Sequence, residues 1–174
     1  GNQALSNETT GDANVAIGSN AMSSTTLARR NVAVGFQALQ DLTYSSLTLS
    51  YNVGVGHAAG ANITSGVENT IVGGQAGDSL TEGSYNTLLG KGAGTDLTTG
   101  TRNTFGGVLS GGDTTIGNFN TALGYDSLRR NIDGDNNTAI GYKALEDYED
   151  GDGNGHNTAI GNSSQLNATT GEFN

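Results

Sequence analysis

The chain lacks the residues on which most compact folds depend. Its 174 residues include no cysteine, proline or tryptophan, and only four phenylalanines and six tyrosines. Without cysteine there is neither a disulfide framework nor thiolate chemistry. A hydrophobic fraction of 33%, supplied mainly by small and aliphatic side chains, cannot fill a thick globular core. The apolar residues are therefore expected to form a thin layer.

Basic residues and long apolar runs are also scarce. Seven lysines and arginines stand against 17 acidic residues, which gives a formal net charge of -10. Binding of nucleic acid or an anionic membrane needs several cations, so both are poor partners. No apolar run approaches the ~20 residues that cross a bilayer, and we expect no membrane insertion in this segment. The charged fraction is only 14%, which argues against disorder.

A five-residue signature organises the chain: asparagine, a β-branched residue, a variable small or apolar residue, an aliphatic residue and glycine. It begins at nine asparagines, which are Asn14, Asn31, Asn52, Asn69, Asn86, Asn103, Asn120, Asn137 and Asn157. Subtracting successive positions gives spacings of 17, 21, 17, 17, 17, 17, 17 and 20. A fixed period this short indicates stacked repeat units rather than a globular fold.

Each unit is predicted to contain a strand, a glycine bend, a second short strand and a polar turn. We therefore predict an all-β fold, a parallel β-solenoid (β-roll or β-helix) with coils of about 17 residues. Stacked coils would bring the repeat asparagines ~4.8 Å apart, where their amides can form a hydrogen-bonded ladder. The chain starts at Gly1 without methionine, so residues 1–174 are expected to be one repetitive shaft segment of a longer chain.

Strand alternation places the second and fourth signature positions on one face and the third on the other. We assign the second and fourth positions to the inside of the coil. The third position then points outward, and it is apolar in three successive units at Ile71, Leu88 and Phe105. An apolar outer face needs a cover, so these three residues are predicted to form an oligomer interface. The alternative is a wider monomeric solenoid with a second internal layer.

One unit departs from the signature. In the sequence NTFGG, Gly106 takes the fourth position, which is aliphatic in the other eight units. On the assignment above, Gly106 leaves a gap in the core, which the neighbouring Phe105 is expected to refill.

The strings NTALGYDSL from Asn120 and NTAIGYKAL from Asn137 resemble repeats of phage tail-fibre proteins and related bacterial tail-fibre-domain proteins. NVAIG and NVAVG are also similar to the NSVAIG-type repeat of trimeric autotransporter adhesin heads, which form parallel β-rolls in threes. The resemblance implies a homotrimeric, extracellular fibre shaft or adhesin stalk on a virion or bacterial cell surface. Its partners would be two further copies of the chain and a cell-surface glycan or receptor. The period of this chain is longer than the unit of the adhesin heads.

No catalytic constellation is visible in the sequence. The two histidines, His57 and His156, are about six units apart and cannot share a site within one chain, so we expect a non-catalytic protein without a cofactor. Asp150, Asp152 and Asn154 alternate like the first oxygen ligands of a calcium loop. Gly161 stands where such a loop needs a bidentate glutamate, and a solvated acidic turn is the alternative.

Three functions are compatible with the sequence. The first is a structural attachment fibre, and the second is a bacterial cell-surface adhesin or extracellular filament. The third is an ice- or carbohydrate-binding solenoid, which would need a flat exposed row of threonines; the repeated threonines are assigned here to the interior, which disfavours it. The insertion containing Tyr44, Leu47, Leu49 and Tyr51 is predicted to form a lateral loop that either binds a partner or packs on a neighbour.

Overall fold

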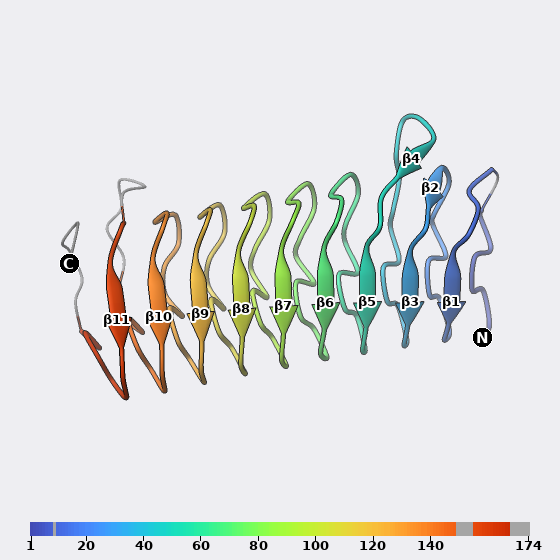
Figure 1. The fold of residues 1–174 in the computed structure, drawn as a ribbon. Helices are drawn as coiled ribbons and strands as arrows, with labels where there is room; N and C mark the ends of the chain where they lie inside the picture. The colour runs from blue at the N-terminus through green and yellow to red at the C-terminus, as the bar shows by residue number, and fades with distance from the viewer. Residues whose placement is uncertain (9, 149–154, 168–174) are drawn as a thin grey trace.

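The computed structural model describes residues 1–8, 10–148 and 155–167. Within this part of the chain the regular structure consists of short strands joined by turns (Figure 1). The strands are β1 (Val15–Ile17), β2 (Ala28–Arg29), β3 (Val32–Val34), β4 (Thr48–Leu49), β5 (Val53–Val55), β6 (Thr70–Val72), β7 (Thr87–Leu89), β8 (Thr104–Gly106), β9 (Thr121–Leu123), β10 (Thr138–Ile140) and β11 (Thr158–Ile160).

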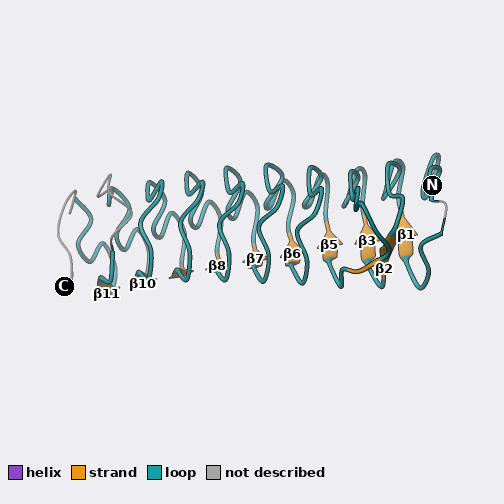
Figure 2. Cartoon of the chain, turned by 90° about the horizontal axis from the view of Figure 1, so that it is seen from above, coloured by secondary structure: helices purple, strands orange, loops and turns teal. Residues whose placement is uncertain are grey.

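The strands that follow the repeat asparagines stack in one parallel sheet. Its order is β1-β3-β5-β6-β7-β8-β9-β10-β11, so each strand pairs with the corresponding strand of the next coil. Like positions are paired throughout; Thr70 pairs with Thr87, and Thr87 pairs with Thr104. Figures 1 and 2 show the coils following one another in a single row. The predicted parallel β-solenoid, with coils of the length that the sequence repeat indicates, is confirmed. The second short strand predicted after each glycine bend was wrong: the segment from Gly124 to Leu128, for example, forms a turn.

The assignment of the inner and outer faces was wrong. The third-position residues Ile71, Leu88 and Phe105 are completely buried inside the coil of a single chain, so they do not form an oligomer interface. The fourth-position residues point outward, and Leu89 is 45% exposed. Alternation identifies the residues that share a face, but it does not determine which face lies inside. Gly106 is therefore a gap in the outer face, and Phe105 does not refill it.

The interior is filled by complementary pairs of side chains. Numbered from the repeat asparagine, the third and ninth positions of a unit face one another within the thin coil. Seven units follow one of two patterns. Either the third residue is large and the ninth is glycine, or the third residue is alanine and the ninth is leucine or methionine. The pairs are Ala16 with Met22, Ala33 with Leu39, Ile71 with Gly77, Leu88 with Gly94, Phe105 with Gly111, Ala122 with Leu128, and Ala139 with Leu145. One large side chain thus fills this level of the core in each of these coils.

The distances show why the ninth position cannot be enlarged beside a large third residue. A Cβ added at Gly111 would lie 2.4 Å from Cε2 of Phe105. A Cβ at Gly94 would lie 3.1 Å from Leu88 and 3.2 Å from Phe105 of the next coil. Packing is therefore shared between neighbouring coils.

The glycine that ends each signature makes a bend that other residues cannot make. Gly90 has φ of +136°, and a Cβ there would lie 2.4 Å from the carbonyl oxygen of Gly107 in the next coil. Both the backbone angle and the close stacking of coils therefore require glycine at this position.

The four-residue insertion between β3 and β5 forms a lateral arm, as the sequence predicted. We call residues 45–49 the arm; it contains β4, which pairs in parallel with β2 of the preceding coil. In Figure 1, β4 projects above the edge of the main sheet at which the strands begin. Tyr44 remains inside the enlarged coil, where its hydroxyl donates a hydrogen bond to the carbonyl oxygen of Gly66 (2.6 Å). Burial raises the pKa of this phenol.

The core pairs predict a compensating double substitution. Gly111→Leu alone should clash with Phe105 and cost about 1–3 kcal/mol of stability, as overpacking usually does. Phe105→Ala alone should cost about 3–5 kcal/mol because it empties the coil. Together they recreate the pairing of Ala122 with Leu128, so the double variant should lose much less than the sum. The free energies of unfolding in urea test this, and additive losses would contradict the pairing.

Candidate functional surface

The repeat asparagines form a continuous buried ladder. In each step the side-chain Oδ1 of one asparagine accepts the backbone N–H of the next, at 2.8–3.1 Å. The ladder connects Asn14, Asn31, Asn52, Asn69, Asn86, Asn103, Asn120, Asn137 and Asn157. The structural ladder predicted from the sequence is therefore confirmed.

The same amide also closes its own coil. Asn86 Nδ2 donates to Asn69 Oδ1 (3.1 Å) and to the carbonyl oxygen of Gly100, 14 residues later in the same unit (3.0 Å). Asparagine is the residue that presents a donor and an acceptor at this short reach. Because Asn86 is completely buried, the ladder is a structural element rather than a binding surface.

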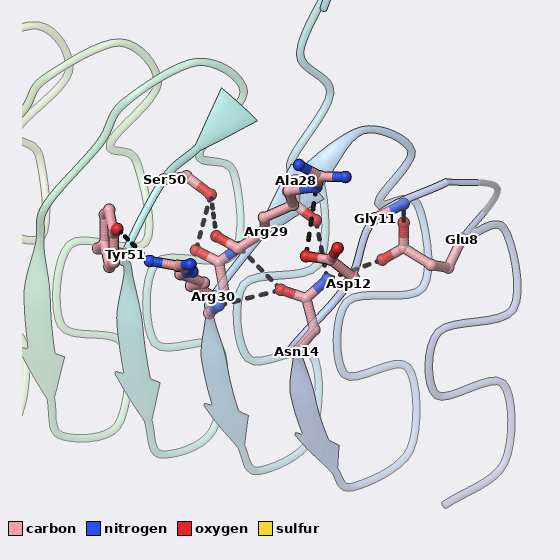
Figure 3. Close-up of polar contacts among 10 residues, drawn as sticks. Glu8, Gly11, Asp12, Asn14, Ala28, Arg29, Arg30, Ser50 and Tyr51 are labelled. Carbon is pink, nitrogen blue, oxygen red and sulfur yellow. Dashed lines mark hydrogen bonds and ion pairs between the residues drawn. The ribbon is translucent and has the colours of Figure 1, made fainter. Parts of the chain in front are cut away.

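At the first described coil a carboxylate joins the ladder. Glu8 Oε2 accepts a hydrogen bond from Asn14 Nδ2 (3.0 Å), and Glu8 Oε1 accepts one from the backbone N–H of Gly11 (2.7 Å; Figure 3). The other proton of Asn14 Nδ2 goes to the carbonyl oxygen of Ala28 (2.8 Å), as in later coils. Glu8 thus accepts the Nδ2 proton that Oδ1 of the preceding asparagine accepts in a regular step such as Asn14 to Asn31.

A continuous exposed feature is the outer sheet face, which consists of the second and fourth positions of the stacked strands. The second position changes from valine in β1, β3 and β5 to threonine from β6 onward, and the fourth is aliphatic except at Gly106. Ile17, Leu89, Leu123 and Ile160 are 59%, 45%, 41% and 67% exposed. No charged residue takes either position in the strands that the structure describes. The outer sheet face is therefore a flat, uncharged surface.

Aromatic and cationic side chains line both margins of the outer sheet face. We call the residues just before the repeat asparagines the leading edge; there Arg102 lies over the rings of Tyr85 (5.2 Å) and Phe119 (5.3 Å). We call the residues just after the signature glycines the trailing edge. On it Phe36 stacks with His57, and Tyr125 with Tyr142, with ring centroids 5.5 and 5.6 Å apart. These margins add aromatic rings and a few charged groups, including Arg102 and Lys91, on either side of the outer sheet face.

Acidic residues lie mainly away from the outer sheet face. Asp78, Asp96 and Asp113 follow one another in successive turns between strands. Burial, then the charges of Asp113 and Asp78, raise the pKa of the Asp96 carboxyl. These three carboxylates repel one another within the turns, and none of them lies on the outer sheet face.

The structure gives no support for a catalytic or metal centre within the described residues. His57 is exposed and stacked on Phe36, and His156 is exposed in a distant coil. Among the residues described, no group of three or more acidic or histidine side chains is placed to hold a metal ion, and no pocket is found. The candidate calcium ligands Asp150, Asp152 and Asn154 lie outside the described residues. The described part of the chain contains no helix that could cross a membrane.

Comparison with protein-family models, with curated proteins and with solved structures finds no match to this chain.

The ladder predicts a large effect for one buried amide. Asn86→Ala removes the acceptor of the Asn103 N–H and the donor to Gly100. Leaving buried backbone groups unpaired should cost roughly 1–3 kcal/mol for each group. Thermal unfolding followed by circular dichroism measures the loss. Thr99→Ala, at an exposed turn position, is the control and should leave the midpoint nearly unchanged; equal effects of the two substitutions would contradict the structural role of the amide.

Proposed function

We propose that the chain is a non-catalytic structural shaft that associates with two further copies through its outer sheet face. The assembly would form a homotrimeric, extracellular attachment fibre on a virion or bacterial cell. The observation that carries this proposal is the continuous exposed, uncharged face of the stacked strands.

The extent of the outer sheet face supports association. The described strands of the main sheet stack to a length of ~38 Å, and a strand with its two margins is ~15 Å wide. The resulting area of roughly 600 Å², which includes charged margin residues such as Glu68, Lys91 and Arg102, is near the ~800 Å² that each partner buries in a stable complex. A face of this kind favours burial against protein.

The periodicity of the outer sheet face favours another copy of the chain as the partner. Its side chains repeat once per coil, at the spacing of paired strands. Only a surface with the same repeat can contact each coil in the same way, and identical chains related by rotation about an axis parallel to the rod satisfy this condition. The number three comes from the resemblance of the repeats to trimeric fibre and adhesin proteins.

An attachment role fits a stiff rod better than catalysis does. In-register coils transmit force along the axis, while recognition of a cell-surface glycan or receptor belongs to loops or to other parts of the fibre. A bacterial cell-surface adhesin or extracellular filament would use the same architecture, and flanking sequence distinguishes these settings.

A second candidate function is favoured by one specific observation. The repeated threonines, which the sequence assigned to the interior, lie on the outer sheet face. They form an in-register row from Thr70 through Thr87, Thr104 and Thr121 to Thr138 and Thr158. A flat row of hydroxyl and methyl groups is suited to an ordered ligand such as ice or a polysaccharide. This function competes with trimer formation for the same face.

The trimer proposal predicts the mass of the native particle and its sensitivity to charge. Light scattering after size exclusion should give three chains, or about 53 kDa from the chain mass of 17.6 kDa. Leu89→Asp with Leu123→Asp should yield monomers, because charges would be buried against the partner chains. Ile132→Asp, at a 40% exposed turn position outside the strands, is the matched control and should remain trimeric. A monomeric wild-type protein would overturn the proposal.

The ligand-binding candidate needs a free outer sheet face, whereas the trimer covers this face. If the trimer forms, the wild-type protein should show neither thermal hysteresis nor retention on insoluble polysaccharide. A monomer that shows either activity, and loses it in Thr87→Val with Thr121→Val, would favour the ligand-binding function because valine preserves the shape but removes the hydroxyl.

A further inference from the structure

The arm presents apolar side chains at the leading edge. Leu47 and Leu49 are 45% and 48% exposed, and Tyr51, which follows on the leading edge, is 43% exposed. The arm is held in place by the pairing of β4 with β2, and the Thr48 N–H donates to the carbonyl oxygen of Leu27 (2.9 Å). Its apolar surface is therefore preformed.

The trailing edge of the same coils carries a second exposed apolar feature. Phe36 follows β3 and is 44% exposed, and its ring stacks on the exposed His57 that follows β5. Within one chain this pair and the arm lie at opposite ends of the strands, since Tyr51 precedes β5 and His57 follows it.

Rotational symmetry brings these two features together between chains. In a cyclic trimer, the contacts away from the axis are head-to-tail: they join one edge of a chain to a different edge of the next. The outer sheet faces turn toward the axis, so the leading edge of one chain lies beside the trailing edge of its neighbour. A rotation without translation keeps corresponding coils at the same height along the rod.

We propose that Leu47 and Leu49 of the arm, together with the following Tyr51, pack on the Phe36–His57 pair of the next copy and so fix the axial register of the chains. The proposal depends on the trimer proposed above and specifies its contacts.

The repeat itself leaves the register ambiguous. On the outer sheet face most neighbouring coils present the same or similar side chains, so sliding one chain by one coil, ~4.8 Å, sacrifices little more than the contacts of one coil. The arm interrupts the regular period between β3 and β5. A contact that occurs only once along the rod is lost in every displaced register, so it favours the aligned one. A single polar residue in the core of a coiled coil fixes the register in the same way.

Disulfide trapping tests the arrangement, because the chain has no cysteine of its own. The matched variant carries Tyr51→Cys and His57→Cys, which leaves Leu47, Leu49 and Phe36 in place. The displaced variant carries Tyr51→Cys and Lys91→Cys; Lys91 lies on the trailing edge two coils, ~10 Å, beyond His57. A disulfide needs Cα atoms within ~7 Å, so only neighbouring edges can be linked.

The expected result is covalent dimers and trimers, and nothing larger, on a non-reducing gel of the oxidised matched variant, with loss of these bands in the displaced variant. Adding Leu47→Ser and Leu49→Ser to both should preserve the trimer but allow the displaced pair to link as well. Particle mass is measured separately under reducing conditions.

The outcomes separate the two proposals. A trimeric mass with equal linking of both pairs, with no linking, or with selectivity that survives the serine substitutions would overturn the role of the arm while the trimer stands. A monomeric mass under reducing conditions would overturn the proposed trimer itself, whatever the gel shows.

Discussion

The structure depends on one buried side chain that both closes a coil and stacks it on the next. Through Oδ1 and Nδ2, Asn86 is bonded to the preceding and following asparagines and to the end of its own unit. Closure and stacking are therefore coupled, and a coil cannot rotate or shift without breaking both. This coupling keeps corresponding side chains in register along the rod.

The regular outer surface follows from the regular interior. Because such a short coil encloses little volume, the third position and its partner at the ninth share the space of one large side chain. The aliphatic residues of the fourth position, such as Leu89, have no room inside and remain on the surface. An exposed apolar face is thus a consequence of a narrow cross-section, and association is the means of covering it.

The sequence was sufficient to predict the coil length, the parallel stacking and the asparagine ladder, because each depends on exact repetition. It was not sufficient for the direction of the faces, since alternation is symmetrical with respect to inside and outside. A usable signal was nevertheless present: glycine follows Phe105 by six residues, whereas leucine follows Ala122 by six. Reading the third and ninth positions together would have placed Phe105 inside and the threonine row outside.

The arm was predicted only as an irregularity. Its extra length and apolar residues were visible in the sequence, but a strand as short as β4 has no alternation that would reveal its pairing with β2. Its position at the leading edge depends on the coil geometry, which has to be known first. The same holds for the stacking of Phe36 on His57, which belong to neighbouring coils and meet only when the enlarged coil is closed.

The sharing of core space between neighbours has a consequence for how such rods change in evolution. A unit can be duplicated or lost without altering the coil, so length is free to vary by recombination between repeats. The order of the units is less free. Gly94, at the ninth position of its unit, leaves room for Phe105 of the following unit, and a unit with leucine at the ninth position could not precede the Phe105 unit. Recombination that keeps neighbouring units together therefore preserves the packing, whereas exchange of single units risks a clash between coils.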